Sequence, residues 1–546
     1  MLNKSAAVFI FALLIVIAAC SRSNLPDSGS ALVTAEHHPF GKYEQPITLR
    51  IGMGVDPTFK SYTGETPARN PWVTAIKDTL NVNIKIDWMV ANENMEQKID
   101  LAIASNTLPD AMVVSQFQLK QMVKADELAD LTEVYHRYAS PVMKRIIDST
   151  NGKAMEHATF DGKMLALPSV EAEDISMMWI RQDWLDRLGL QPPATMEKLE
   201  QTARAFVERD PDGNGRADTV GIVTGPSLYD DFHSGPGSFN LNPVFSAYNS
   251  YPGFWLKSAD GKPVYGSIQP ETKAALAKLR DLYGSGLIDQ EMGIRESPAE
   301  AVIDGKGGIF FAPFSGGYWP VPEALKNNPR ANWQAYALPL DADGHFNAKM
   351  FKPTKSFVVV RKGYEYPEAV IKVANLILRD EYKYGIDFQP LRITLAPRDE
   401  ISFSVKALHD VMAGASKPED FADKVEYSLL HNDLNAIKNT KLAPYDRTDI
   451  QYWNTRGSNF KRAYSLLVGG RNLLDPNLNK VSSIYYSHTE TMETQWRHLV
   501  DAEMDLFTQI IMGVAPLEAF DRWVEEWKRQ GGDRITNEVA QAMMQR

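Results

Sequence analysis

The feature that most constrains the fold is a repeated alternation of short β-rich runs with longer amphipathic runs. Residues 47–55, "ITLRIGMGV", alternate in polarity and predict a strand. The run "NPWVTAIKDTL" predicts a helix with Pro71 in its first turn, and "NVNIKIDWMV" predicts a second strand. Strands that alternate with helices in this way predict an α/β fold with a largely parallel sheet.

The same alternation returns later in the chain. A turn and strand are predicted in "DGKMLALPSV", and a strand and helix in "MMWIRQDWLDRLGL". A buried strand is predicted in "GKGGIFFAPFSGGYWP", and a strand with a helix in "KSFVVVRKGYEYPEAVIKVANLIL". The tail is mainly helical, and its Trp523 and Trp527 lie on one helical face, which indicates packing. A chain of 546 residues is too long for one core and predicts two or more domains.

The first residues predict a processing signal. Lys4 precedes 14 apolar residues, from Ala6 to Ala19, which is too short a run to span a bilayer and is typical of a signal peptide at residues 1–19. The run ends in "IAAC", which resembles a bacterial lipobox, and Cys20 is the single cysteine of the chain. The motif predicts a diacylglycerol on the thiol of Cys20, with palmitate among the acyl chains. The mature protein would then lie on the extracytoplasmic face of the cell membrane, held by its lipid.

Residues 20–45 are rich in Ser, Pro and Gly without a hydrophobic period, and predict a flexible tether. The formal charge of −11 is spread along the chain, and there is no long basic run. Because phosphate binding needs clustered Lys and Arg, the composition argues against a nucleic-acid partner.

A metal-like loop follows the predicted helix "MEKLEQTARAFVERD". In "DPDGNGRADT", Asp210, Asp212, Asn214 and Asp218 take positions 1, 3, 5 and 9 of a calcium loop, with Gly215 at position 6. An EF-hand would place a bidentate Glu at position 12, where this chain has glycine. The spacing predicts structural calcium, and a metal-free Asp/Asn/Gly turn is the alternative.

Catalytic signatures do not stand out. The sequence has no HExxH, no GxSxG, no P-loop and no cysteine nucleophile. A glycosidase with two distant carboxylates stays open, because its acids need not be close in sequence.

Seven segments, in order, resemble the extracellular solute-binding lipoproteins of carbohydrate ABC importers, in the long subgroup that includes alginate-oligosaccharide binders. They are the lipobox at Cys20, "ASNTLPDAMV", "DGKMLALP", "MWIRQDWLDRLGLQPPAT", "DPDGNGRADT", "YGSIQPETKAALAKLRDLYGSGLIDQEM" and "MGVAPLEAFDRWVEEWKRQGGDRIT". Together they span most of the chain.

The resemblance implies a two-lobed, periplasmic-binding-protein-like α/β fold, with ligand in the cleft, hinge closure and a long helical C-terminal tail on the second lobe. The crossings are expected near residues 166–173 and 305–319. The first lobe would comprise residues 46–168 and 305–355, and the second would comprise residues 169–304 and 356–546. The resemblance also implies a loop that binds calcium without the EF-hand Glu, with the Arg216 carbonyl and Thr219 as further ligands. In the subgroup an acidic residue often takes the place of Thr219.

The predicted function is a lipid-anchored, monomeric receptor that is not an enzyme, binds an oligosaccharide and passes it to the ABC permease subunits. The alternatives are a secreted lipoprotein enzyme on polysaccharide, and a receptor for a peptide or another non-sugar solute. Sugars stack on aromatic rings and hydrogen-bond to planar polar groups, so loop aromatics are the main candidates. The candidate ligand-binding residues are Tyr251, Trp255, Tyr318, Trp319, Arg181 and Asp110, with Trp72 and Trp453 as weaker candidates.

Overall fold

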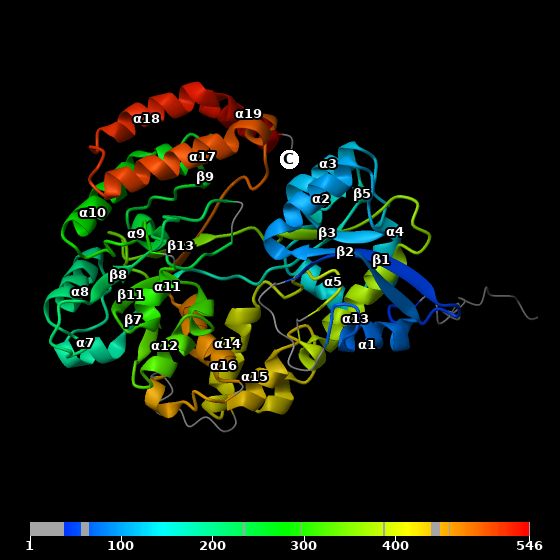
Figure 1. Cartoon of the computed structure of the whole chain (residues 1–546), viewed down its shortest axis with the longest axis horizontal. Coiled ribbons are helices and arrows are strands. Elements are labelled where there is room, and N and C mark those ends of the chain that lie inside the picture. The colour runs from blue at the N-terminus through cyan, green and yellow to red at the C-terminus, as the bar shows by residue number, and fades with distance from the viewer. Residues whose placement is uncertain are drawn as a thin grey trace, which may run out of the picture.

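The computed structural model describes residues 38–55, 65–232, 235–295, 297–385, 388–437, 448–457 and 459–544. The signal peptide, Cys20 and most of the tether therefore lie outside the described residues. The chain forms two lobes, each built around a β-sheet, and Figure 1 shows them side by side with the C-terminal helices on the larger lobe.

The first sheet has the order β2-β1-β3-β14-β6 among the described residues. Its strands are β1 (Ile47–Val55), β2 (Val82–Ala91), β3 (Ala111–Ser115), β6 (Leu167–Pro168) and β14 (Ser356–Val360). Strand β1 runs parallel to β2 and β3, whereas β14 runs antiparallel to β3 and β6. The helices of this lobe are α1 (Pro71–Leu80), α2 (Met95–Ala104), α3 (Gln116–Lys124), α4 (Thr132–Tyr138), α5 (Pro141–Asp148), α6 (Lys153–Glu156) and α13 (Glu368–Tyr384), with the hairpin β4 (Thr159–Phe160) and β5 (Lys163–Met164).

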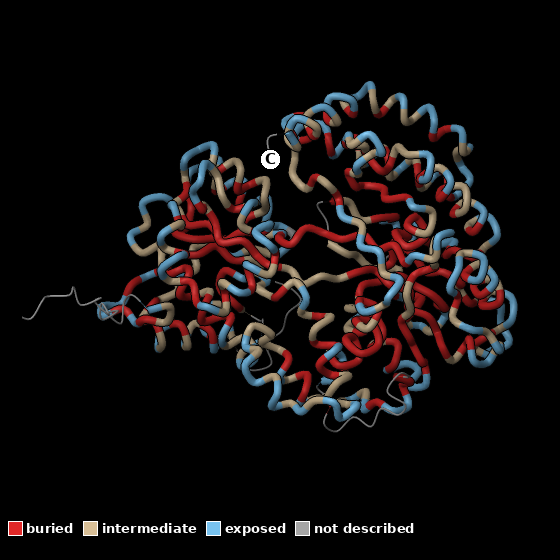
Figure 2. The backbone as a smooth tube through the Cα atoms, turned by 180° about the vertical axis from the view of Figure 1, so that it is seen from behind, coloured by how far each residue is buried: buried red, intermediate tan, exposed pale blue. Residues whose placement is uncertain are grey.

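The second sheet has the order β12-β7-β11-β8. Its strands are β7 (Met177–Arg181), β8 (Val220–Val223), β11 (Gly307–Ala312) and β12 (Trp333–Tyr336). Every residue of β7 and β11 is buried, which explains their continuous apolar runs. The helices of this lobe are α7 (Gln182–Leu188), α8 (Met196–Glu208), α9 (Asn242–Ala247), α10 (Pro270–Gly284), α11 (Ala299–Ile303), α12 (Val321–Asn327), α14 (Glu400–Met412), α15 (Leu430–Ile437) and α16 (Phe460–Tyr464). Figure 2 shows the sheet strands as the buried centre of each lobe.

The predicted division between the lobes is wrong in two segments. Strand β11 pairs with β7 and β8 of the second lobe, although residues 305–355 were expected in the first. Strand β14 pairs with β3 of the first lobe, and the buried face of α13 joins the first-lobe core, although both were expected in the second. Both strands are buried apolar runs, so their sequences do not show which sheet they enter, because that depends on long-range pairing.

Three segments of the described chain cross between the lobes, and they lie side by side. The first follows β6, the second joins β13 (Phe346–Met350) to β14, and the third leads from α13 to α14. The first crosses near the expected residues 166–173, whereas the expected crossing at 305–319 lies inside the second lobe. Glu171 N donates to Pro353 O at 2.8 Å, and Val170 N donates to Thr394 O at 2.8 Å. These bonds join the three crossings into one strap.

The C-terminal tail lies against the second lobe. It comprises α17 (Glu490–Ile511), α18 (Ala519–Trp527) and α19 (Asp533–Met544). The Nη1 of Arg280 in α10 donates to Ala515 O at 2.9 Å, and Lys273 Nζ lies 2.6 Å from a carboxylate oxygen of Asp521. Two short ribbons complete this region: β13 pairs with β15 (Leu478–Ser482), and β9 (Trp255–Lys257) pairs with β10 (Pro263–Tyr265). Within the described ranges, no helix is both long and apolar enough to cross a membrane.

Candidate functional site

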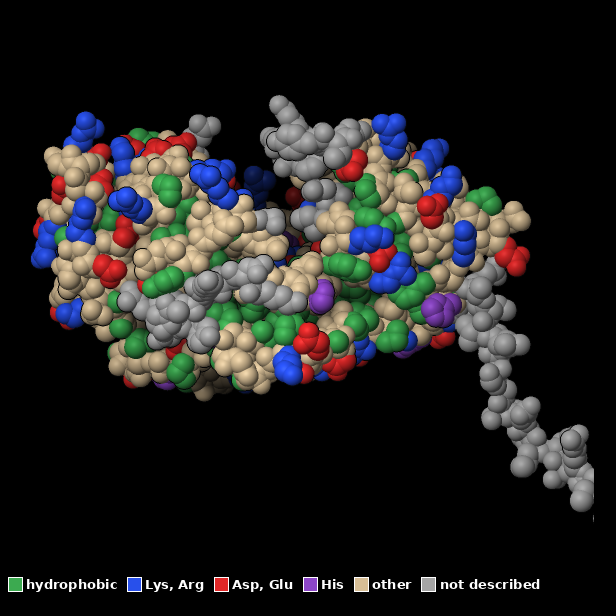
Figure 3. All heavy atoms as spheres, turned by 90° about the horizontal axis from the view of Figure 1, so that it is seen from below, with side chains coloured by type: hydrophobic (Ala, Val, Ile, Leu, Met, Phe, Trp, Pro, Cys, Tyr) green, Lys and Arg blue, Asp and Glu red, His purple; other side chains and the backbone are tan. Residues whose placement is uncertain are grey.

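A pocket of about 330 Å³ lies where the three crossings meet both lobes. The crossings contribute Glu171 and Lys352, and the second lobe contributes Phe314 at the end of β11. Figure 3 shows the surface hollowed between the two halves, with charged side chains visible in its depth. The charged and aromatic residues of the lining are Glu171, Asp174, Phe314, Phe351, Lys352, Lys355, Glu381, Arg392, Arg398, Glu400 and Arg462. The wall is therefore more charged than aromatic.

An ion-pair cluster forms the second-lobe side of the pocket. Arg462 Nε donates to Asp433 Oδ1 at 2.5 Å and its Nη2 donates to Asp433 Oδ2 at 2.9 Å. The same Nη2 lies 3.3 Å from Glu400 Oε1. Burial raises the pKa of Glu400, and the charge of Arg462 opposes that rise. The cluster links α14, α15 and α16 and fixes the guanidinium at the pocket wall.

Asp174 is a carboxyl with a raised pKa at the pocket. It accepts from the N–H of Ile175 at 2.8 Å and from the N–H of Phe314 at 3.3 Å. Burial raises the pKa of Asp174 to about 7, and these bonds oppose the rise. It ties the first crossing to the loop after β11, so it positions Phe314.

Two predicted ligand residues lie beside this wall. Trp319 is 45% exposed, and its backbone N–H donates to the carbonyl of Ser315, a lining residue, at 3.2 Å. Its ring meets Phe239 edge-on, with centroids 5.9 Å apart. Tyr318 is mostly buried and packs edge-on against Phe314 at 6.0 Å. Of the predicted aromatics, Trp319 is the most exposed, and it lies next to the lining residues rather than among them.

The aromatic predictions for Trp255 and Tyr251 are wrong in this structure. Trp255 is fully buried in a cluster with Tyr265, Trp496 and Trp527, and its centroid lies 5.2 Å from that of Tyr265. Tyr251 is 7% exposed in the same cluster. The Pro-Gly turn before Trp255 folds the loop onto the helical tail, which covers the ring.

The remaining predicted contacts also have structural roles. Trp72 and Trp453 are buried, and their indole N–H groups donate to the carbonyls of Gly385 and Thr448. Arg181 is buried between the carboxylate of Asp183 and the ring of Trp184. Asp110 accepts from the backbone N–H of Arg50 at 2.9 Å and pairs with Arg361 at 3.0 Å. These partners use the polar groups that a ligand would need.

Sequence reasoning missed the charged pocket residues. Asp174, Lys352, Arg398 and Arg462 come from distant parts of the chain and share no motif. One local signal was available: in "KMFKPTKSFVVV", the three lysines Lys349, Lys352 and Lys355 lie close together at the start of a predicted strand.

The calcium-like loop has the geometry of an oxygen-lined turn. The carboxylate of Asp210 accepts from the N–H groups of Gly213, Asn214 and Gly215 at 2.9–3.1 Å. The amide of Asn214 reaches carboxylate oxygens of both Asp212, at 2.7 Å, and Asp218, at 3.1 Å. Burial, and then the hydrogen bond with Asp210, raise the pKa of the Asp212 carboxyl. These contacts are local hydrogen bonds, and they gather three carboxylates on one loop, which is the kind of oxygen-rich ligand set that calcium takes.

The two further predicted ligands of the loop are Thr219 and the carbonyl of Arg216. The hydroxyl of Thr219 is buried and donates to the carbonyl of Phe206 at 2.7 Å, so this side chain faces the second-lobe core and its predicted role as a ligand is wrong. The backbone N–H of Arg216 donates to the amide oxygen of Asn214 at 2.7 Å, which places the residue on the loop.

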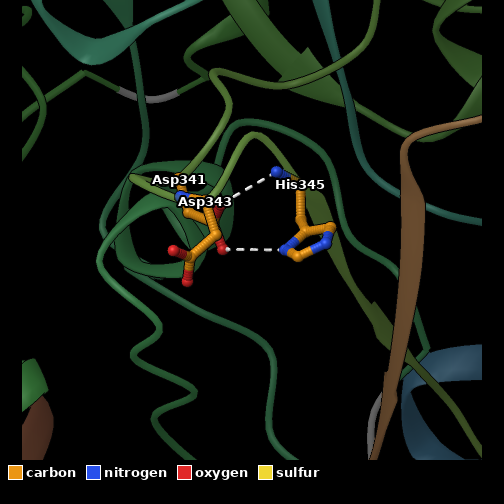
Figure 4. Close-up of side chains that lie close together, drawn as sticks. All are labelled: Asp341, Asp343 and His345. Carbon is orange, nitrogen blue, oxygen red and sulfur yellow. Dashed lines mark hydrogen bonds and ion pairs between the residues drawn. The ribbon is translucent and has the colours of Figure 1, made fainter.

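A second acidic turn, Asp341, Asp343 and His345, has an explanation without metal (Figure 4). The carboxylate of Asp341 accepts from the N–H groups of Asp343 and His345 at 3.0 and 2.8 Å. Its other oxygen accepts from Asn347 Nδ2 at 2.6 Å. Asp341 therefore closes the turn before β13 by local hydrogen bonds.

Comparison with known proteins gives the family. The family model described as bacterial extracellular solute-binding protein matches residues 73–373, more than half of the chain. The chain belongs to this family. The match covers segments of both lobes and the first two crossings.

Two relatives illustrate the similarity in sequence. Lipoprotein LipO of Bacillus subtilis (strain 168) is 22% identical over 487 residues, which cover 87% of this chain and 89% of LipO. The fructooligosaccharide ABC transporter substrate-binding protein FusA of Streptococcus pneumoniae is 28% identical over 305 residues, which cover 53% of each chain.

Solved structures show the same fold. The alginate-binding protein AlgQ2, solved without calcium ion, superposes with a TM-score of 0.58 at 16% identity, and covers 92% of this chain and 98% of AlgQ2. FusA in complex with kestose superposes with a TM-score of 0.60 at 18% identity, and covers 91% of this chain and 99% of FusA. The predicted two-lobed α/β fold is thus confirmed.

Proposed function

We propose that this solute-binding protein is the receptor of an ABC importer, binds an oligosaccharide between its lobes and presents it to the permease. The observation that carries the proposal is the pocket bounded by all three crossings, because a ligand there contacts both lobes and the strap that joins them. The similarity to FusA, a fructooligosaccharide-binding protein, and to AlgQ2, an alginate-binding protein, supports a saccharide ligand. The exposed ring of Trp319 supplies a stacking surface at the rim.

The test is a thermal-shift screen against oligosaccharides, followed by calorimetric titration of those that stabilise the protein. A ligand at 100 times its Kd adds about 2.7 kcal/mol to the free energy of unfolding. Trp319→Ala should weaken binding about tenfold or more, whereas Tyr452→Ala, a control at an exposed ring with no bond to a lining residue, should bind as the parent does. Continuous release of new reducing ends would contradict a receptor and favour the polysaccharide enzyme.

For the loop at residues 210–218, the proposal includes structural calcium held by Asp210, Asp212, Asn214 and Asp218. The convergence of their side chains supports it. Chelator should lower Tm and added calcium should restore it, with an effect of about 2.7 kcal/mol when calcium is at 100 times its Kd. Asp212→Ala should remove this response, whereas Asp343→Ala, in the other acidic turn, should retain it. If chelator does not change the Tm of the parent protein, the calcium proposal is contradicted and the loop is a metal-free turn.

The proposal also includes a lipid anchor at Cys20, supported by the lipobox and by the similarity to lipoprotein LipO. Cys20→Ala should move the protein from the membrane pellet to the supernatant, because the helices of the described residues include no spanning segment. The Tm of the variant should equal that of the parent. A variant that stays in the pellet after a salt wash would contradict the anchor.

A further inference from the structure

Lys352 is a buried cation at the interlobe pocket. It is 5% exposed and lies in the crossing between β13 and β14. An ammonium has three N–H donors, and the described residues give this one a single hydrogen bond, to Gln116 Oε1 at 3.4 Å. Burial lowers the pKa of Lys352 to about 8, Lys120 and Lys355 lower it further, and Asp231 opposes this. A buried charge with so few partners has hydrogen-bonding capacity left for a ligand.

Lys355 places a second ammonium at the same pocket. It lies three residues further along the crossing, and its side chain is 43% exposed. The Nζ reaches the second-lobe loop at Gly235, where an added Cβ would lie only 2.4 Å from it. Its nearest carboxylate oxygen is that of Glu171, at 3.9 Å, which is too long for a hydrogen bond.

Among the acidic groups of the lining, Glu171 alone lies within ion-pair distance of these two lysines, and it forms no hydrogen bond with Lys355. Asp174 accepts two backbone N–H groups, and burial raises its pKa to about 7. Glu400 lies beside Arg462, and burial raises the pKa of Glu381. The donors left for a ligand at this part of the pocket therefore belong to Lys352, Lys355 and Arg392.

We propose that the pocket recognises an acidic saccharide, whose carboxylate binds the ammonium groups of Lys352 and Lys355. This inference rests on the proposed function and names the ligand's chemistry. A neutral hydroxyl accepts a hydrogen bond but does not compensate a buried positive charge. A carboxylate does both, because it carries the opposite charge and can accept about four hydrogen bonds.

The test uses oligosaccharides in matched pairs: oligomers of galacturonate, glucuronate and mannuronate against the galactose, glucose and mannose oligomers of equal length. Calorimetric titration should show at least one acidic oligomer that binds 100-fold or more tightly than its neutral counterpart. Lys352→Met and Lys355→Met should each reduce that affinity 10- to 100-fold, whereas Lys262→Met, a control at an exposed lysine, should leave it unchanged.

A second readout separates recognition from a structural role. Lys352→Met without ligand should melt at the parent temperature or above it, because the variant removes a buried charge; a large fall in Tm would mean that Lys352 supports the fold. A neutral oligomer that binds as tightly as its acidic partner would overturn the inference and leave the receptor function intact. Equal binding of free acetate or sulfate would overturn the assignment to a sugar acid. Failure of every saccharide to bind would overturn the proposed function.

Discussion

The aromatic cluster of the second lobe and the interlobe pocket reverse what the sequence predicts. The cluster, where ligand contacts were expected, is buried, and the pocket is lined by residues for which no contact was expected. Trp255, with its Pro-Gly turn, predicts a ligand surface, yet it packs against Tyr265 and Trp496 inside the lobe. The pocket is lined by acids and bases that carry no motif. Large rings bury 150–250 Å² each, so most aromatics of a binding protein stabilise its fold. The proposed ligand surface is instead marked by Lys352, a buried cation with one hydrogen bond among the described residues.

The largest expected effect tests the cluster. Trp255→Ala should lower the free energy of unfolding by about 3–5 kcal/mol, because it leaves a cavity among packed rings. The control is Trp319→Ala, which removes a ring that is 45% exposed and should change stability by less than about 1 kcal/mol. Chemical denaturation of the ligand-free proteins measures both. If both variants lose the same free energy of unfolding, the proposed difference between the buried cluster and the exposed pocket rim is contradicted.

A somewhat smaller effect tests the charged wall of the pocket. Arg462→Met should cost about 3 kcal/mol in the ligand-free protein, because Asp433 and Glu400 would lose their shared guanidinium. The control is the triple variant Arg462→Met, Asp433→Asn, Glu400→Gln, which removes the whole set of charges and should recover much of the loss. A single variant as stable as the parent would show that the cluster does not depend on this charge.

The smallest expected effect is a pH dependence. Glu503 is fully buried, accepts from the Tyr229 hydroxyl, and burial raises its pKa to about 7. An unfolded Glu titrates near 4.3, so between about pH 4.5 and 7 the folded state binds the extra proton and stability falls as pH rises, by at most about 1.4 kcal/mol per pH unit. Glu503→Gln should flatten this fall in a series of melting curves.

Asp174 sharpens the same experiment, because its pKa is raised in the same direction at the pocket. Part of the fall in stability should therefore persist in Glu503→Gln. A saturating ligand should change the part of the remaining slope that comes from Asp174, and leave the contribution of Glu503 unchanged. A variant whose slope equals that of the parent would contradict the raised pKa of Glu503.

Local patterns predicted what local interactions determine. Residues 47–55 form the expected strand, Pro71 begins its helix, and the loop at Asp210 forms the expected turn. The sheet that receives β11 or β14 depends on pairing across more than a hundred residues, which alternation does not encode. The burial of Trp255 depends on α17 and α19, which come late in the chain. The charged residues of the pocket could not be predicted for the same reason, because they are far apart in the sequence and become neighbours only in the folded chain.

The place of β14 in the first sheet has a consequence for how the chain acquires its structure. Strand β3 is followed within 55 residues by β6, but β14, which lies between them, ends only at Val360. During synthesis, which begins at the N-terminus, the first sheet therefore has an unpaired edge until the ribosome has made most of the second lobe. Open edges invite pairing with other chains, and contacts so distant in sequence form slowly. The first lobe begins the chain, yet its sheet cannot be completed until β7, β8, β11 and β12 of the second lobe have all appeared.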